Sequence, residues 1–365
     1  MIRPAPAIEA IPATTPFVGP EQLMRESARS ELVRLGANES AFGPSPLAVS
    51  AMSAELPRIA WYGDPESYEL REALAIKHKC RVEELVVTAG IDDVMGLVVR
   101  AFVAPGGAAL TTRGSYPTLN YHVIGYGGRL VYADYRGDGR LDLDGIIDVA
   151  RRERPSVIYL ANPDNPSGTF VSRGDMIAFF EALPRDAVFM LDEAYADFVE
   201  EEELLPQHIE DRLIRMRTFS KAYGMAGARI GYAFTTQANV ETLQKIRLHY
   251  GVNRNAQIGA LTSLADEPFR RSVVDQTAAA REDYYRIARD LGLGYLESST
   301  NFACIDLGTK DRANRVLAEL LARGVWIRKP GLPPLDRFIR VSAGTPPMRA
   351  AFERAFREVL AEVPA

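Results

Sequence analysis

The sequence predicts an α/β protein with a large domain built on a mostly parallel sheet and a smaller C-terminal α/β domain. The first observation is an alternation of short apolar segments with helical segments between residues 86 and 216, which is typical of βαβ units. The second is a change of character near residue 254, where long helical segments are followed by shorter strands. In such sheets ligands bind beyond the carboxyl ends of the strands.

The composition excludes several classes of protein. The chain has 365 residues, of which 47% are apolar and 25% charged, as in an ordinary globular protein of about two domains. The net charge of −5 does not indicate the basic surface that a nucleic-acid-binding protein needs. Cys80 and Cys304 form no metal or disulfide pattern and favour a reducing compartment. No apolar run or signal pattern indicates a membrane, so we expect a cytoplasmic protein without a metal.

The first part of the chain is expected to be an arm, residues 1–37, with a helix over Glu21–Arg34 that packs against the small domain. A loop with several prolines follows, and Asn38 is its side chain most able to bind a ligand. Asn38 can equally be an ordinary turn residue. Trp61–Pro65 is a second turn, which carries Tyr62 and precedes a helix over residues 66–78.

A buried strand over Val86–Gly90 leads directly into a helix over Ile91–Phe102. A strand, a glycine and a helix N-terminus form an anion site, because the first backbone N–H groups of a helix have no partner within it. Gly90, Ile91 and Asp92 are therefore candidates for binding an anion. An ordinary βα junction has the same pattern, and Asp92 also suits a first helical turn.

Further strands are predicted over five segments: Ala109–Thr112, Leu130–Tyr132, Val157–Leu160, Ala187–Leu191 and Leu213–Met216. Helices are predicted from Tyr116–Pro117 and near residues 143–152 and 173–183. Polar groups follow several strands: Tyr116 could stack on a flat ligand or simply pack, Asn165 lies between two prolines, and Asp192 and Tyr195 follow an apolar strand. Turn and cap roles explain each of these residues equally well when it is considered alone.

The segment Thr218–Tyr232 places Lys221 on a turn after the last of these strands. Arg229 lies eight residues further on, roughly two helical turns, so both cations can face one site. Together with the hydroxyls of Thr218 and Ser220 they suit a phosphate. A lysine close to another cation loses proton affinity and becomes a usable nucleophile. A solvated basic turn is the alternative.

The C-terminal region is predicted to contain four helices and three strands: helices 255–266, Glu267–Leu291, 312–323 and 347–361, and strands Asn301–Ile305, Val325–Ile327 and Phe338–Val341. We therefore expect a large domain over residues 38–255 and a small domain over residues 256–365. Cys304 lies within a predicted strand and is expected to be buried rather than reactive.

The strand ends together supply an amine, a carboxylate, an amide, a phenol, a stacking ring and a phosphate site. Pyridoxal 5′-phosphate requires this set: an amine for its aldehyde, an anion for its ring nitrogen, hydrogen bonds for its phenolic oxygen and a site for its phosphate. The sequence therefore predicts pyridoxal 5′-phosphate as the cofactor.

At this point the chain resembles the fold-type I, class I/II aminotransferases, and most closely their histidinol-phosphate aminotransferase branch. The resemblance runs from about Pro16 to the end. Six motifs carry it: Asn38–Pro46, Asp64–Arg71, Asn162–Gly168, Asp192–Tyr195, Ser220–Arg229 and Ile339–Thr345. It implies the fold-type I architecture, with a seven-stranded type of sheet in the large domain.

The resemblance implies roles for the cofactor residues. Lys221 would bond the cofactor's aldehyde and later move the substrate proton, and Asp192 would keep the ring nitrogen protonated. Asn165 and Tyr195 would hold the phenolic oxygen, and Tyr116 would stack on the ring. The phosphate would be bound by Gly90, Ile91, Asp92, Thr218, Ser220 and Arg229. Tyr62 would reach the phosphate in the other subunit, which implies a homodimer.

The resemblance also implies a substrate site. Arg340 would bind the substrate carboxylate as a bidentate fork, with Asn38 beside it, and Phe17 and Arg328 would line the distal pocket. Phe17 replaces an expected tyrosine, which weakens histidinol phosphate as the substrate, and Gly63 replaces an expected proline. Aromatic residues would favour an aromatic or bulky amino acid, namely Trp61, Tyr62, Phe17 and Tyr250.

The expected function is a pyridoxal-phosphate-dependent aminotransferase that moves an amino group between an L-amino acid, aromatic or similar to histidinol phosphate, and a 2-keto acid. A decarboxylase of the threonine-phosphate decarboxylase type remains open, because it uses the same scaffold. A non-catalytic sensor domain of a transcription regulator is disfavoured, because the chain has no spare N-terminal length for a DNA-binding domain. The expected partners are small amino and keto acids.

Overall fold

The computed structural model describes residues 2–9, 11, 17–27, 30–206 and 209–363. Pro12 and Pro16 of the expected arm, the start of the family resemblance and residues 28–29 of the expected first helix lie outside this part of the chain.

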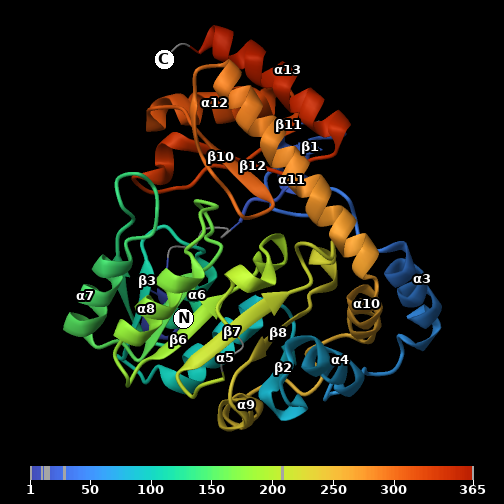
Figure 1. Cartoon of the computed structure of the whole chain (residues 1–365), viewed down its shortest axis with the longest axis vertical. Coiled ribbons are helices and arrows are strands. Elements are labelled where there is room, and N and C mark those ends of the chain that lie inside the picture. Colours follow the sequence, from blue (N-terminus) through green and yellow to red (C-terminus); the bar gives the residue numbers. More distant parts are fainter. Residues whose placement is uncertain (1, 10, 12–16, 28–29, 207–208, 364–365) are drawn as a thin grey trace.

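The large domain is built on a seven-stranded sheet with the strand order β2-β8-β7-β6-β5-β3-β4 (Figure 1). Its strands are β2 (Leu85–Thr88), β3 (Ala108–Thr112), β4 (Arg129–Ala133), β5 (Val157–Ala161), β6 (Val188–Asp192), β7 (Leu213–Thr218) and β8 (Gly231–Phe234). Only β8 pairs antiparallel with its neighbours, β2 and β7. The mostly parallel sheet that the sequence predicts is therefore confirmed.

Helices cover both faces of this sheet. One face packs in an apolar cluster with α5 (Ile91–Phe102), α6 (Thr118–Gly125) and α9 (Gln237–Gln244). The other face packs with α7 (Leu143–Glu153) and α8 (Arg173–Ala182). Consecutive residues of β5 go to opposite clusters: Val157 and Tyr159 to the first, Ile158 and Leu160 to the second. Burial of both faces explains the almost continuous apolar segments in the sequence.

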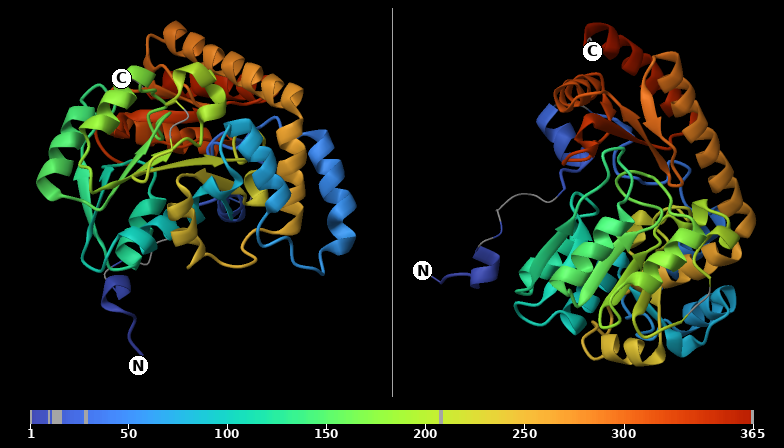
Figure 2. Two further views of the ribbon diagram at one scale, coloured as in Figure 1. Left: turned by 60° about the horizontal axis from the view of Figure 1, so that its bottom comes forward. Right: turned by 60° about the vertical axis from the view of Figure 1, so that its left-hand side comes forward.

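The edge of the large domain beside β2 consists of α3 (Pro46–Glu55), α4 (Tyr68–His78) and α10 (Arg254–Ala265). Because α10 packs against α3 and α4, we propose that the large domain ends near residue 265 rather than 255. From there α11 (Glu267–Asp290) runs along one side of the molecule to the small domain, as both views in Figure 2 show. The expected helices in these two regions agree with α10 and α11 within a residue or two.

The small domain contains an antiparallel sheet of three strands in the order β12-β10-β9. These strands are β9 (Gly294–Leu296), β10 (Phe302–Asp306) and β12 (Phe338–Ser342), and α12 (Lys310–Ala322) and α13 (Pro346–Glu362) pack with α11 around them. The sheet places Arg340, in β12, opposite Cys304 in β10, which is buried as expected.

The N-terminal arm differs from its expected structure. The helix α2 (Pro20–Ser27) is shorter than the predicted Glu21–Arg34, because Val33–Arg34 form strand β1, which pairs in parallel with β11 (Val325–Trp326) of the small domain. A short helix, α1 (Pro6–Glu9), packs instead against α6 of the large domain. In the described part of the arm, β1 thus contacts the small domain and α1 contacts the large domain. Among the described residues, no helix is long and apolar enough to cross a membrane.

Candidate active site

The carboxyl ends of β3, β5, β6 and β7 and the N-terminus of α5 enclose a cavity of about 220 Å³, which we name the inner cavity. Most of the predicted cofactor residues line it: Ile91, Asp92, Tyr116, Asn165, Asp192, Tyr195, Thr218, Ser220, Lys221 and Arg229. Side chains that are up to 138 positions apart in the chain, from Ile91 to Arg229, therefore meet at one sheet edge. Gly90 and Tyr62, the other two predicted residues, do not line this cavity.

Lys221 lies on the loop after β7, and its Nζ atom donates a hydrogen bond to the backbone oxygen of Asn38 at 3.1 Å. The same atom lies 5.6 Å from the centre of the Tyr195 ring. Burial, and then the nearby guanidinium of Arg340, lower the pKa of Lys221 to about 8. The amine is therefore more readily neutral than an exposed lysine, as a nucleophile requires.

Asp192 ends β6, and its carboxylate is held by two donors. The hydroxyl of Tyr159 donates to Oδ2 at 2.7 Å, and the backbone N–H of Ala194 donates to Oδ1 at 2.9 Å. Burial raises the pKa of Asp192 to about 6, and these two hydrogen bonds and Lys221 oppose that rise. The carboxylate thus remains charged at neutral pH and can hold a protonated ring nitrogen.

The phosphate end of the inner cavity lies at the start of α5. Gly90 adopts a φ of 90°, and a Cβ atom there would lie 2.6 Å from Nη2 of Arg229, so a glycine lets the guanidinium approach the helix N-terminus. Arg229 also donates to Asp92 at 3.3 Å, and Thr218 donates to the hydroxyl of Ser220 at 2.9 Å. The helix N-terminus, the cation and the hydroxyls fit a phosphate group.

The expected helical path from Lys221 to Arg229 is wrong. The segment contains only a short 3₁₀ turn over Ala226–Ala228, and Arg229 itself has a left-handed φ of 56°. The two cations still line the same cavity, because β8 folds back beside β7 and brings Arg229 next to the start of α5.

A second cavity of about 590 Å³, the outer cavity, shares Ala37, Tyr116, Asn165 and Lys221 with the inner one. Four more cations line it, namely Arg113, Arg328, Lys329 and Arg340. Among the described residues, no Asp or Glu lines this cavity. The guanidinium carbon of Arg328 lies 3.9 Å from the centre of the Phe17 ring. The outer cavity therefore attracts anions, and it combines predicted substrate residues of the arm, the large domain and the small domain.

Asn38 connects the two cavities. Its amide nitrogen donates to the hydroxyl of Tyr195 at 2.9 Å, and its backbone oxygen accepts from Lys221 and from the amide of Asn301. Burial raises the pKa of Tyr195, so the phenol stays protonated and can donate to an oxygen in the inner cavity. Asn301 was not predicted from the sequence, where it appears only as the first residue of a strand.

The aromatic residues that line the outer cavity differ in part from the expected ones, because Tyr116 and Tyr132 line it. Phe17 lines the outer cavity, but Trp61, Tyr62 and Tyr250 line neither cavity. Tyr62 is 74% exposed, and its ring stacks on that of Tyr250 with centres 4.3 Å apart.

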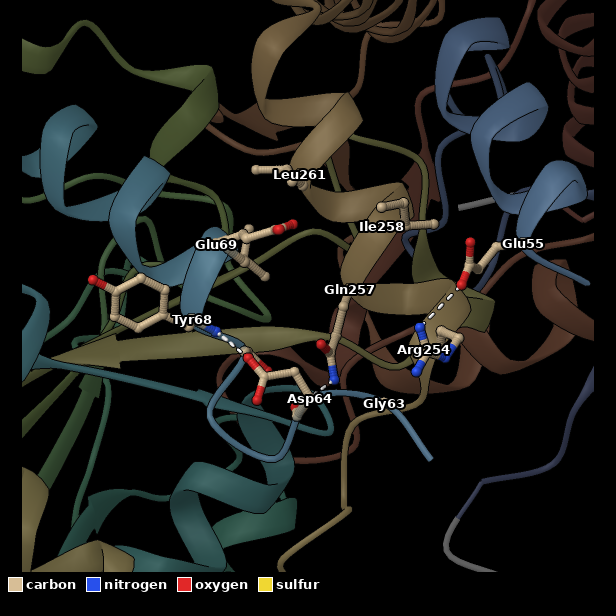
Figure 3. Close-up of a pocket in the computed structure, with 11 residues that line it drawn as sticks. Glu55, Gly63, Asp64, Tyr68, Glu69, Arg254, Gln257, Ile258 and Leu261 are labelled. Carbon is tan, nitrogen blue, oxygen red and sulfur yellow. Dashed lines mark hydrogen bonds and ion pairs between the residues drawn. The ribbon is translucent and has the colours of Figure 1, made fainter. Parts of the chain in front are cut away.

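The turn that carries Tyr62 is fixed to the N-terminus of α10 (Figure 3). Arg254 bridges Glu55, at 3.0 Å, and the backbone oxygen of Tyr62, at 2.8 Å, and Gln257 donates to the backbone oxygen of Asp64 at 2.9 Å. A Cβ atom at Gly63 would lie 2.7 Å from the amide nitrogen of Gln257. The backbone of Arg254 would lie 3.2 Å from the same Cβ atom, so a side chain at the position where we expected proline would crowd the start of α10.

Sequence reasoning missed several residues that support the site. The hydroxyl of Tyr159 donates a hydrogen bond to Asp192, but a tyrosine within an apolar strand is normally interpreted as a core residue. Glu193 is buried and bonds Arg215 and Arg217 on the neighbouring strand β7, at 2.6 and 3.1 Å. Charged residues alternating in β7 were a possible signal for this second buried network.

The side chains of the inner cavity fit pyridoxal 5′-phosphate, because they provide the partly buried amine of Lys221, the buried carboxylate of Asp192 and a separate phosphate site. When bound, this cofactor supplies an electron-accepting ring. Lys221, Asp192 and Arg229 would hold its aldehyde carbon, ring nitrogen and phosphate, respectively.

Comparisons with known proteins identify the family. The model of the family "Aminotransferase class I and II" matches residues 30–354. A histidinol-phosphate aminotransferase of Geobacillus thermodenitrificans is 32% identical over 93% of both chains, and one of Carboxydothermus hydrogenoformans is 31% identical over 97% of this chain and 98% of its own. The crystal structure of histidinol-phosphate aminotransferase from Sinorhizobium meliloti with pyridoxal-5′-phosphate has a TM-score of 0.95 and 39% identity, covering 100% of this chain and 99% of its own. The chain therefore belongs to the class I and II aminotransferases, has their fold-type I architecture and uses pyridoxal 5′-phosphate.

Proposed function

We propose that this aminotransferase acts on an amino compound that carries a distal phosphate, of the histidinol-phosphate type, and passes the amino group to a 2-keto acid. The observation that supports this most strongly is the outer cavity, where Arg113, Arg328, Lys329 and Arg340 surround a space next to Lys221. Four cations without a lining carboxylate suit a dianion better than the neutral side chain of an aromatic amino acid.

The observation in favour of an aromatic amino acid is that rings line the outer cavity, namely those of Tyr116 and Tyr132 and the fully apolar ring of Phe17. That ring lies against Arg328, however, and a guanidinium stacked on a ring still presents its N–H groups at its edge. Phe17 therefore orients Arg328 rather than replaces it. For this reason we place the phosphate-bearing substrate first, although the tyrosine hydroxyl that we expected at position 17 is absent.

We propose the following roles for the residues of the site. Lys221 holds the cofactor and then carries the proton that leaves the substrate Cα. Asp192 keeps the ring nitrogen charged, while Asn165 and Tyr195 donate to the phenolic oxygen and Tyr116 stacks on the ring. The backbone amides of Ile91 and Asp92 bind the phosphate with Thr218, Ser220 and Arg229, while Gly90, whose N–H donates to the backbone oxygen of Thr88, lets Arg229 approach. Arg340 and Asn38 hold the anionic group of the acid substrate.

We also propose a homodimer in which Tyr62 completes the phosphate site of the partner subunit. In support, Tyr62 is exposed, stacked on Tyr250 and fixed through Arg254, although it reaches neither cavity of its own chain. Such a pre-positioned exposed ring suits a contact with a second copy. The two cysteines are free thiols, which is consistent with a reducing compartment such as the cytoplasm, where we propose that the enzyme works.

The test is a substrate panel on the holoenzyme. We expect histidinol phosphate to convert the cofactor to its amine form at least 100-fold more efficiently than histidinol, because two or more charge-assisted hydrogen bonds of ~1.5 kcal/mol or more each are lost with the phosphate. An Arg328→Met variant should lose most of that ratio. Faster reaction of phenylalanine or tyrosine would contradict the proposal. Release of carbon dioxide would instead support the decarboxylase, which no relative described above favours.

A further inference from the structure

Tyr159 lies within β5, and its side chain reaches the carboxylate that ends the neighbouring strand β6. The parallel register pairs Ala161 with Asp192, so Tyr159, two residues earlier, lies on the same face of the sheet as both. Its side chain is 1% exposed and packs in the apolar cluster that includes α5. Within this apolar environment its hydroxyl donates to Oδ2 of Asp192 at 2.7 Å.

The other groups around Asp192 show how much its charge depends on the hydroxyl of Tyr159. The carboxylate has about four acceptor positions, of which Tyr159 and the N–H of Ala194 occupy two, so a ring N–H can still be accepted. Asp92, from α5, disfavours the negative charge of Asp192, while Lys221, after β7, favours that charge. The phenols of Tyr116 and Tyr195 also lie close enough to feel the charge of Asp192. The hydroxyl of Tyr159 is thus the side-chain donor that directly holds the ionised form.

We propose that Tyr159 is a positioning residue, whose hydroxyl orients Asp192 and keeps it ionised so that the carboxylate can hold the protonated ring nitrogen of pyridoxal 5′-phosphate. A buried hydrogen bond from a phenol to a carboxylate favours the charged form of the acid. Removal of the phenol oxygen leaves the ring and its packing in place but removes this preference. The inference depends on the cofactor and not on which substrate the enzyme uses.

The test compares Tyr159→Phe with Tyr232→Phe in the full chain. Tyr232 is also a buried sheet tyrosine whose hydroxyl lies 2.8 Å from Nε2 of His78, but it lies outside both cavities. The affinity of the cofactor-free protein for pyridoxal 5′-phosphate would be measured by fluorescence between about pH 5 and pH 8, a range that brackets the titration of a perturbed carboxyl. We expect the affinity to fall at acid pH as Asp192 is protonated. For Tyr159→Phe we expect the midpoint of this fall to move up by about one pH unit, equivalent to roughly fivefold weaker binding at the wild-type midpoint and about tenfold weaker binding well below it.

Two further measurements make the outcome decisive. The Asp192→Asn variant should bind the cofactor weakly, and its affinity should not fall at acid pH. This result would identify Asp192 as the titrating group. The ¹⁵N chemical shift of ring-labelled cofactor in the holoenzyme should show a less protonated ring nitrogen in Tyr159→Phe than in the wild type. An unchanged midpoint and an unchanged nitrogen shift in Tyr159→Phe, or an equal change in Tyr232→Phe, would overturn the proposal and make Tyr159 a core residue only.

Discussion

Arg340 donates a hydrogen bond from Nη1 to the Oδ1 atom of Asn165 at 2.7 Å, and so connects the small domain to the loop after β5. The Nε atom of the same guanidinium is buried and has no hydrogen-bond partner among the described residues. A buried donor without an acceptor costs free energy, and an incoming carboxylate or phosphate would remove that cost. The contact therefore places a partly satisfied cation at the boundary of the inner and outer cavities.

The first prediction concerns this guanidinium. Arg340→Lys keeps the charge but loses the planar fork, so we expect kcat/KM to fall by about 10- to 100-fold, mainly through KM, at the ~1.5–3 kcal/mol typical of charge-assisted hydrogen bonds. Steady-state kinetics with the amino donor would measure this. Arg337→Lys is the control, because Arg337 pairs with Asp306 at 2.9 Å and lines neither cavity. Equal losses in the two variants would count against a role of Arg340 in binding.

The second prediction tests the shared site. Co-expression of Lys221→Ala chains with Tyr62→Ala chains should yield mixed dimers that contain one site with both wild-type residues. We expect these dimers to be more active than either homodimer if Tyr62, as proposed, acts on the partner's cavity. Purification through two different affinity tags isolates the mixed species. If Tyr62 acted within its own chain, or not at all, the mixed dimer would show no such gain.

The third prediction concerns the stability of the cofactor-free protein. Burial raises the pKa of Asp192 from 3.8 to about 6, so this group destabilises the folded state above about pH 6, and the cost disappears as the pH falls towards 3.8. The difference corresponds to at most about 3 kcal/mol. Urea unfolding should therefore show that the stability of wild type relative to Asp192→Asn improves from neutral to acid pH. A difference that stays constant with pH would contradict the burial argument.

The fourth prediction concerns the buried network beside Asp192. Glu193 pairs with Arg215 and Arg217, and all three side chains are at most 4% exposed. Glu193→Gln removes the charge that compensates two buried guanidinium groups, so we expect a loss of about 3–5 kcal/mol in the free energy of unfolding. The control is Glu282→Gln, which breaks the exposed pair with Arg289 and should cost less than about 1 kcal/mol. Chemical denaturation of both variants measures the contrast.

Local signals in the sequence were sufficient for much of this fold. The helix Ile91–Phe102 was predicted with the bounds that the structure has, because an apolar strand, a glycine and two acidic residues mark its start. The strands near Val157 and Leu213 were also predicted from a local signal, because buried parallel strands give short continuous apolar segments. Lys221, Asp192 and Asn165 meet because parallel strands present their carboxyl ends at one sheet edge.

Features that depend on distant partners were not predictable in this way. Val33–Arg34 continue a helical pattern in the sequence, but pairing with Val325–Trp326 makes them a strand. The turn between Lys221 and Arg229 follows the fold-back of β8, a four-residue strand that we did not predict. The bond from Tyr159 to Asp192 needs the register of β5 against β6, which a single strand does not reveal.

The central claim is that the amine of Lys221 carries pyridoxal 5′-phosphate while Asp192 faces its ring nitrogen. Borohydride reduction of the holoenzyme, followed by peptide mass spectrometry, tests it most directly, because reduction makes the cofactor's bond to an amine permanent. We predict a single labelled peptide with the modification on Lys221, and no label in Lys221→Ala. A label on another lysine, or an unlabelled protein that still transfers amino groups, would contradict the account.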